Sequence, residues 1–380
     1  MPYDLQPFLA MDILREAQRL EAEGRQIAHL ELGEPGTPAA PAVIEAARQA
    51  MDAPLGYTSA KGLPPLRAAL ADYYRDRHGV AVDPEAIFAT MGSSSGFILA
   101  FHAAFRPGAK IAITRPGYPA YVNTLVGLGF EPVEIALHAG NGWMLSADDV
   151  ARAHAETPFE GLLFASPANP TGASLPREAL RDILAACADL GVRAISDEIY
   201  HGLDYAAPSA SALEFTRNAI VINSFSKYYC MTGWRIGWMV MPEALERRAE
   251  MLAQNLFISA PTISQIAATV ALGEIDYAEA RKAEYAANRT VLLNGLAQLG
   301  FEVAVPPTGA FYVYAGIGRH GNDALDFCRR LLSESGVAAT PGLDFDRTDG
   351  NRYVRFSYAG PRATIDAALD RLEAFVGTGK

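Results

Sequence analysis

The sequence predicts an α/β fold in which helices cover both faces of a mostly parallel sheet, with a smaller α+β domain attached. From about residue 45, short apolar runs rich in branched side chains alternate with helical segments, as strands buried on both faces do. Alternating strands and helices produce a parallel sheet. Beyond residue 300, short strand and helix patterns follow a long helix. The 380 residues are enough for both units.

The elements are expected in a definite order along the chain. An amphipathic helix over 11–28 precedes an extended segment over 29–35 and a Gly/Pro-rich loop. The strands of the main sheet are expected at 86–90, 110–114, 162–165, 193–196, 219–223 and 236–240. After these come a helix at 273–300, strands at 301–305, 310–314 and 353–357, and a helix near 323–335.

This order divides the chain into three parts. We expect an N-terminal arm that forms part of the small domain over 1–44. A large domain follows over 45–280, and a small C-terminal α+β domain over 281–380. Ligands of parallel α/β sheets bind beyond the carboxyl ends of the strands. The functional residues are therefore expected directly after the apolar runs.

Bulk properties exclude several classes of function. The net charge of −11 and the lack of a Lys/Arg-rich run argue against nucleic-acid binding. Cys187, Cys230 and Cys328 form no CxxC pair, and the seven histidines show no HExxH spacing, so we expect neither a disulfide framework nor a metal site. The N-terminus lacks the apolar core of a secretory signal and no run is long enough to span a membrane. A cytoplasmic protein is expected.

Lys227 lies in the most informative segment of the chain. It follows Ser224 and Ser226, and Arg235 comes eight residues later between two glycines. An isolated lysine is most often a solvated surface charge. Here the hydroxyls and the guanidinium form an anion site beside an amine. A Schiff base to pyridoxal phosphate requires this combination.

A Gly/Ser run at 92–96 contains Ser93 and Ser94 and lies between the strand that ends at Thr90 and a helix expected near Phe97. Free N–H groups and hydroxyls at a helix N-terminus bind phosphate. A Gly/Ser turn that only caps the helix is the commoner interpretation. The run lacks the spacing of a dinucleotide site or a P-loop, so neither nucleotide site is predicted.

Two further loops follow predicted strands. Tyr118 lies on a Pro/Gly-rich loop, where its ring can stack on a flat heteroaromatic cofactor or simply pack against the turn. Asn169 lies between prolines in the segment 166–172. Asn-Pro-Thr-Gly is a common turn sequence, but its place at the carboxyl end of a strand favours a binding role.

An aspartate, a tyrosine and an arginine complete the candidate site. Asp197 ends an apolar strand, where a buried carboxylate is costly unless it pairs with a cation. The protonated ring nitrogen of pyridoxal phosphate is such a cation, and Tyr200 would reach the ring oxygen. Glu198 could instead cap the next helix. Arg355, on an apolar strand, suits bidentate recognition of a carboxylate, although an edge arginine can also snorkel to solvent.

Taken together, these six separated motifs resemble the class I/II aminotransferases of the pyridoxal-phosphate-dependent fold type I superfamily, which are aspartate aminotransferase-like. The resemblance covers essentially the whole chain and implies pyridoxal 5'-phosphate as the cofactor. It implies that Lys227 forms the internal aldimine and then shuttles the proton at Cα. Asp197 would pair with the pyridinium, Tyr200 and Asn169 would contact the ring oxygen, and Tyr118 would stack on the ring.

The resemblance also assigns the phosphate and substrate contacts. The phosphate cradle would consist of Ser93, Ser94, Ser224, Ser226 and Arg235. Tyr57 resembles the tyrosine that reaches the phosphate of a neighbouring subunit, which implies a homodimer with shared active sites. Arg355 would grip the substrate α-carboxylate, together with the backbone N–H of Gly33 and with Asn169.

The implied reaction moves an amino group between an L-amino acid and a 2-oxo acid by ping-pong chemistry. The alternative on the same scaffold is a carbon–sulfur β-lyase. Regulators that carry this domain need a DNA-binding module, for which the segment before Gly33 is expected to be too short.

The sequence departs from the common pattern of the family in two places. Where the family usually has Gly-Glu-Pro-Asp-Phe, this chain has Gly-Glu-Pro-Gly-Thr over 33–37, and the familiar alanine of the first phosphate loop is Ser93. The neutral segment 254–259 offers no second arginine, which disfavours aspartate as the donor and leaves donor and acceptor open.

Overall fold

The computed structural model describes residues 5–377. Its main sheet has seven strands in the order β2-β8-β7-β6-β5-β3-β4. These strands are β2 Ile87–Thr90, β3 Lys110–Arg115, β4 Glu131–Ala136, β5 Gly161–Ala165, β6 Arg193–Asp197, β7 Ile220–Ser224 and β8 Gly237–Val240. Only β8 runs against its neighbours β2 and β7. The predicted, mostly parallel sheet is therefore confirmed.

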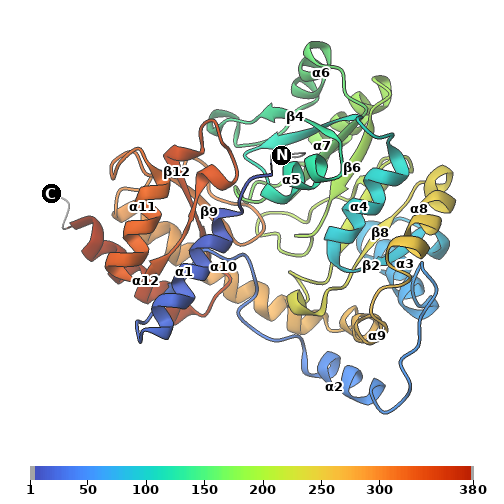
Figure 1. The fold of residues 1–380 in the computed structure, drawn as a ribbon, viewed down its shortest axis with the longest axis horizontal. Helices are drawn as coiled ribbons and strands as arrows, with labels where there is room; N and C mark the ends of the chain where they lie inside the picture. The colour runs from blue at the N-terminus through green and yellow to red at the C-terminus, as the bar shows by residue number, and fades with distance from the viewer. Residues whose placement is uncertain (1–4, 378–380) are drawn as a thin grey trace.

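Helices cover both faces of this sheet (Figure 1). They include α3 Pro64–His78, α4 Gly92–Ala104, α5 Pro119–Gly127, α6 Ala147–Glu156, α7 Arg177–Asp189 and α8 Glu243–Leu256, while α2 Pro41–Ala50 packs on α9 Thr262–Ala271 farther from the sheet. Successive strand residues point to opposite faces. Ile222 of β7 accordingly packs into a core with Leu99 of α4 and Ala249 of α8, whereas Val221 belongs to a core that contains Leu180 of α7.

A second, antiparallel sheet lies beyond the long helix α10 Ile275–Gln298, in the order β11-β12-β9. Its strands are β9 Tyr312–Gly316, β11 Thr340–Pro341 and β12 Tyr353–Ser357, and its helices are α11 Ala324–Arg330 and α12 Arg362–Gly377. The N-terminal helix α1 Leu9–Ala22 lies beside these C-terminal elements (Figure 1). β1 Ala28–His29 pairs with β10 Val337–Ala338. The N-terminal arm thus joins the C-terminal part.

The boundaries proposed at residues 44 and 280 stay a prediction, and residues 1–4 and 378–380 of the outer ranges lie outside the described part of the chain. Within the described residues, no helix has the length and apolar character needed to cross a membrane.

Several elements differ from the prediction. The strand expected at 301–305 is wrong, because only an isolated bridge between Glu302 and Gly316 forms there. Prolines follow at 306 and 307, and proline cannot donate a ladder hydrogen bond. The edge strand β4 was not predicted because it carries exposed polar residues in place of a continuous apolar run. The helix expected near Phe97 begins at Gly92.

Candidate active site

The sheet topology brings the predicted polar segments to one edge. The segments that follow β2, β3, β5, β6 and β7 all leave the sheet at the carboxyl ends of parallel strands. Arg235 precedes β8, but β8 runs in the opposite direction, so its beginning lies at the same edge. The rule that ligands of α/β sheets bind at this edge therefore holds for the position of every large-sheet motif.

A cavity of about 370 Å³ lies at this edge. The predicted residues that line it are Gly33, Ser93, Ser94, Tyr118, Asn169, Asp197, Tyr200, Ser226, Lys227, Arg235 and Arg355. Ser224 lies behind the wall, where its hydroxyl donates to Ser226 Oγ at 2.9 Å. Tyr57 does not line the cavity, and its side chain is 84% exposed on the loop between α2 and α3.

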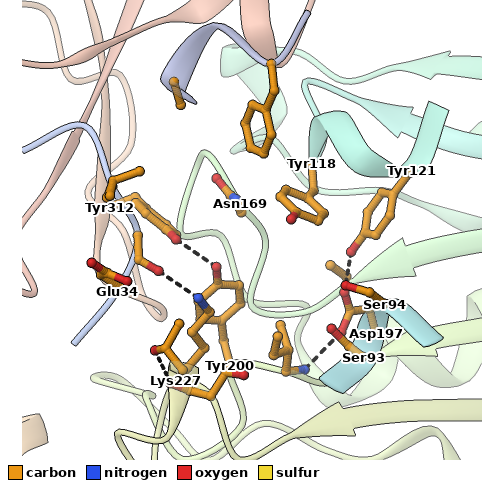
Figure 2. A pocket seen from close by; sticks show the side chains of 18 of the residues that line it. Glu34, Ser93, Ser94, Tyr118, Tyr121, Asn169, Asp197, Tyr200, Lys227 and Tyr312 are labelled. Carbon is orange, nitrogen blue, oxygen red and sulfur yellow. Dashed lines mark hydrogen bonds between the residues drawn. The ribbon is translucent and has the colours of Figure 1, made fainter. Parts of the chain in front are cut away.

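Lys227 projects into the cavity, where its Nζ donates to the Gly33 carbonyl at 2.7 Å (Figure 2). Burial lowers the pKa of Lys227 to about 8. The negative charge of Glu34 opposes this shift, whereas the cations Arg355 and Arg235 reinforce it. A lysine amine with such a pKa is partly neutral near neutral pH and can act as a nucleophile or a base.

Asp197 is the last residue of β6 and is almost fully buried. Burial raises its pKa to about 6, although hydrogen bonds hold the rise in check. The Tyr121 phenol donates to Oδ2, and the Ile199 backbone N–H donates to Oδ1 at 3.1 Å. Tyr121 was missed by the sequence reasoning. Its spacing of three residues from Tyr118, at the start of α5, was the available signal, because such residues share a helix face.

An anion-binding cradle forms where α4 begins. Ser93 and Ser94 lie in the first turn of this helix, whose backbone N–H groups have no partner within the helix. The Arg235 guanidinium packs against Gly92, so that a Cβ atom at residue 92 would lie 2.6 Å from Arg235 Nη2. Ser226 lines the same cavity. This arrangement places a cation, hydroxyls and free N–H groups around one space.

A second cation, Arg355, reaches the cavity from β12 and is only 3% exposed. Its Nη1 donates to Asn169 Oδ1 at 2.9 Å and its Nη2 to Thr340 Oγ1 at 3.3 Å. Within the part of the chain that the structure describes, its Nε has no hydrogen-bond partner. The guanidinium also lies 4.4 Å from the Tyr312 ring centroid. A buried cation with a spare N–H is suited to bind a carboxylate.

Tyr312 is a second residue that the sequence reasoning missed. Its hydroxyl lies 2.8 Å from the Tyr200 hydroxyl (Figure 2). The oxygen also approaches Gly33 so closely that a Cβ atom there would be 1.7 Å away. Gly33 is therefore required for space. Tyr312 lies in the aromatic run 311–314, which is typical of a strand core and gave no sign of a site.

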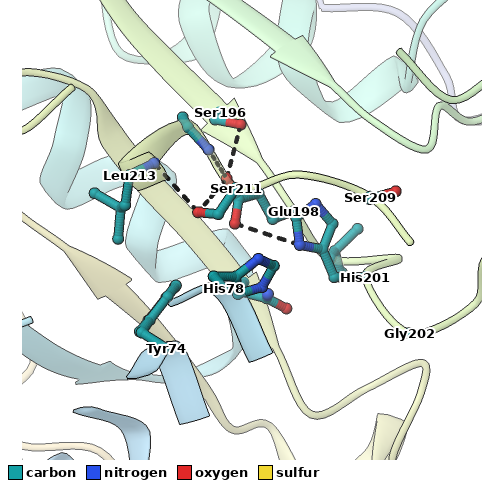
Figure 3. A network of polar contacts seen from close by, with 12 residues as sticks. Tyr74, His78, Ser196, Glu198, His201, Gly202, Ser209, Ser211 and Leu213 are labelled. Atoms are coloured by element: carbon teal, nitrogen blue, oxygen red, sulfur yellow. Dashed lines mark hydrogen bonds and ion pairs between the residues drawn. The ribbon is translucent and has the colours of Figure 1, made fainter. Parts of the chain in front are cut away.

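Glu198 points away from the cavity into a buried polar network (Figure 3). It accepts hydrogen bonds from Ser196 Oγ at 3.2 Å, Ser211 Oγ at 3.0 Å and the Ala212 backbone N–H at 2.8 Å. Burial raises its pKa to about 8. Glu198 thus fixes the start of the short 3₁₀ helix 212–214, which agrees with the alternative interpretation as a capping acid.

The donor set of the cavity fits a phosphorylated aromatic aldehyde such as pyridoxal phosphate. The buried amine of Lys227 matches the aldehyde, and the cradle beside Arg235 matches the phosphate. Because residue 92 has no side chain, the Arg235 guanidinium can lie next to the N-terminus of α4. Asp197 provides a buried carboxylate for a ring nitrogen, and Tyr118 provides an aromatic wall.

Comparison with known proteins agrees with this chemistry. Residues 25–372 match the family "Aminotransferase class I and II". The chain is 45% identical over 376 residues to valine–pyruvate aminotransferase of Mycobacterium tuberculosis, covering 97% of this chain and 96% of the relative. It resembles the crystal structure of an aminotransferase from the same organism, with a TM-score of 0.96, 43% identity and coverage of 99% and 98%.

A further solved structure extends the likeness. Aspartate aminotransferase from Thermus thermophilus with maleate has a TM-score of 0.92 and 31% identity, with coverage of 98% of this chain and 97% of that chain. The protein therefore belongs to the class I and II aminotransferases, a family that depends on pyridoxal phosphate.

Proposed function

We propose that this aminotransferase moves the amino group of an L-amino acid to a 2-oxo acid by ping-pong chemistry that uses Lys227. The observation that carries the proposal is the convergence of three charged groups on one cavity. The Lys227 amine, the Asp197 carboxylate and the Arg355 guanidinium come from different elements and line the same space.

The residues proposed to hold the cofactor follow from their positions. Lys227 would hold the aldehyde carbon, and Asp197 the ring nitrogen. Tyr118 would cover the ring face, while Tyr200 and Asn169 would contact the ring oxygen. The phosphate would be held by Ser93, Ser94, Ser226 and Arg235, with Ser224 supporting Ser226. When bound, pyridoxal phosphate draws electrons from the substrate Cα and makes its proton acidic.

The chain then has to orient the substrate and move that proton. Arg355, with Asn169 and the Gly33 backbone N–H, would hold the α-carboxylate. Lys227 would take the proton from Cα and deliver it to the former aldehyde carbon on the other side of the amino nitrogen, because its pKa of about 8 lies close to neutral pH. Fixing the carboxylate in one place sets which Cα bond faces the lysine.

The proposed homodimer has a candidate surface. Exposed apolar side chains gather in two segments: Met51, Leu55 and Tyr57 in one, and Met251, Leu256 and Ile258 in the other. The first segment is bonded to residues that directly follow the second: the Thr58 N–H donates to Ser259 Oγ at 3.4 Å, and Thr262 Oγ1 donates to the Gly56 carbonyl at 2.7 Å. Apolar patches of this kind mark interaction surfaces. We propose that a second copy covers this patch, with Tyr57 reaching the partner's phosphate cradle.

A two-step assay tests the proposed reaction. Added L-valine should remove the visible absorbance of the bound cofactor aldehyde, and pyruvate or 2-oxoglutarate should restore it. Valine and pyruvate are the first choices because the Mycobacterium tuberculosis relative is named for them. Release of pyruvate and ammonia from cystathionine without any 2-oxo acid would instead show a β-lyase and overturn the proposal.

A further inference from the structure

The main chain from Glu31 to Gly33 is connected to the groups that are proposed to bind the substrate carboxylate. The Glu31 carbonyl accepts hydrogen bonds from Arg355 Nη2 and, at 2.8 Å, from Thr340 Oγ1. Two residues later, Gly33 lines the cavity, and its carbonyl accepts from Lys227 Nζ at 2.7 Å. The position of this short segment therefore affects both proposed carboxylate contacts, the Arg355 guanidinium and the Gly33 backbone N–H.

The side chain of Glu31 is fully buried. Its Oε1 lies 2.7 Å from His29 Nδ1. Its Oε2 has no hydrogen-bond partner within residues 5–377, and because this atom is buried inside the chain, a second copy cannot supply one. A buried carboxylate is costly unless a cation balances its charge. The position of Glu31 therefore depends on the charge of His29.

His29 lies between two carboxylates. Its Nδ1 contacts Glu31, and its Nε2 lies 3.1 Å from Glu21 Oε1 of α1. An ionised carboxylate only accepts hydrogen bonds, so both ring nitrogens must carry a proton for both bonds to form, which makes the ring an imidazolium. The hydrogen bond with Glu31 is the main cause that raises the pKa of His29 to about 9, against the opposing effect of burial. We call Glu21, His29 and Glu31 the arm triad.

The other elements packed against β1 leave the charge of His29 to the arm triad. In the paired strand β10, His29 lies opposite Ala338, which carries no charge. From α12, which packs against β1, Arg371 Nη1 donates to the backbone carbonyls of Gln26 and Gly336 at 2.8 and 3.1 Å. Arg371 thus holds the chain at the start of the strand, whereas the arm triad holds its end.

Loss of the proton from His29 would leave Glu31 buried without a cation. The His29 side chain is 34% exposed, so solvent reaches the ring and can remove the proton. A neutral ring donates from one nitrogen at a time, so one of the two carboxylates then loses its donor. Glu31 must then take up a proton or shift, and its carbonyl is the atom that accepts from the Arg355 guanidinium.

We propose that Glu31 is a positioning residue for the substrate carboxylate, and that it requires the protonated form of His29 to hold Arg355 in place. This inference rests on the proposed aminotransferase function, in which Arg355 binds the α-carboxylate. Because the pKa of His29 is raised to about 9, this contribution to substrate affinity is present below pH 9 and is lost as the pH rises through that value.

The first test measures how tightly the holoenzyme binds 3-methylbutanoate, a carboxylate without an amino group, between pH 7 and pH 10. His29→Asn keeps an N–H donor but carries no charge. At pH 7 this variant should bind 3-methylbutanoate about tenfold more weakly than the wild type, as expected when one hydrogen bond between charged groups is weakened. At pH 10 the two affinities should converge, because the wild-type ring is then neutral as well. Titrations that both proteins share cancel in this comparison.

The second test separates the charge of the arm triad from folding. Glu31→Gln preserves the shape of the side chain but removes its charge, so the affinity for 3-methylbutanoate at pH 7 should again fall about tenfold. The pKa of His29 should fall toward its ordinary value of about 6.5, which NMR with isotope-labelled histidine records, and His29→Asn assigns the signal. Glu16→Gln is the matched control, because Glu16 is an exposed residue of α1 that pairs with Arg19, and it should change neither quantity. The affinity for pyridoxal phosphate should be unchanged in every variant, which shows that each one is folded.

The outcomes distinguish the two proposals. A wild type that converts no amino acid refutes the proposed function, whereas the binding of 3-methylbutanoate still tests the arm triad. Normal turnover together with equal affinities of wild type and His29→Asn at pH 7 refutes the arm triad alone. A tenfold difference that stays constant from pH 7 to pH 10 would indicate a merely structural effect and would also refute the role of the His29 proton. Failure of the wild type to bind 3-methylbutanoate would overturn the inference as well.

Discussion

Replacing Tyr121 by phenylalanine should shift the pH range in which the protein binds its cofactor. The Tyr121 phenol donates to Asp197 Oδ2, and both side chains are buried. A hydrogen bond to an ionised group contributes about 1.5–3 kcal/mol, and one pKa unit corresponds to about 1.4 kcal/mol. Tyr121→Phe should therefore raise the pKa of Asp197, which is about 6 in the wild type, by about one to two units.

The direction of the effect follows from which form binds the cofactor. A carboxylate that pairs with a protonated ring nitrogen must be ionised, and the raised pKa of Asp197 means that this form predominates only above about pH 6. At pH 7 the variant should bind pyridoxal phosphate about two- to tenfold more weakly, because the fraction ionised falls by that factor. At pH 9 the affinities of variant and wild type should converge.

The same shift changes the stability of the apoprotein. Because the folded pKa of Asp197 is raised from 3.8 to about 6, stability is greatest below the ordinary value and is lost as pH rises through the folded pKa. In Tyr121→Phe this loss should extend to higher pH. Tyr118→Phe is the matched control, because its hydroxyl is not bonded to Asp197. An affinity loss of equal size at pH 7 and pH 9 would refute the reasoning.

Three other predictions follow from the site. Lys227→Ala should abolish the visible absorbance of the bound cofactor, and an unchanged spectrum would contradict the assignment. Gly92→Ala should weaken cofactor binding by about tenfold or more, because the new Cβ displaces the Arg235 guanidinium. Gly108→Ala has a similar positive φ but open space around it, so it should cost stability without changing the affinity. Tyr57→Phe should lower activity, and mixing its subunits with Lys227→Ala subunits should restore it in hybrids; no recovery would argue against shared sites.

Much of the fold and most of the candidate site could be predicted from the sequence, because the relevant signals are local. Each buried strand of the main sheet is a continuous apolar run, and the polar segment that follows it must leave the sheet at an edge. Asp197 illustrates this: an acid directly after an apolar run has to be buried and therefore needs a partner. Arg235 was predicted from its spacing after Lys227, but its place at the same edge follows only from the antiparallel direction of β8.

The residues that were missed act through contacts between distant segments. Tyr312 becomes a site residue only because β9 lies against Gly33, and Tyr121 only because α5 places it beside β6. Both are aromatic residues in apolar surroundings, where burial in the core is the usual interpretation. The strand predicted at 301–305 is wrong for a different, local reason. Its apolar pattern is right, but the chain bends at residues 304 and 305, and the two prolines that follow cannot continue a ladder.

The site draws its cofactor groups and its substrate groups from different parts of the molecule. Lys227, Asp197 and the cradle belong to the large sheet, whereas Arg355 belongs to β12 in the C-terminal part. Polar contacts cross between them at several places: Arg355 donates to Asn169, the Arg115 guanidinium donates to Asp346, and the Tyr205 phenol donates to the Ala310 carbonyl. The proposed roles follow this division: the groups of the large sheet would hold the cofactor, and Arg355 would hold the substrate carboxylate.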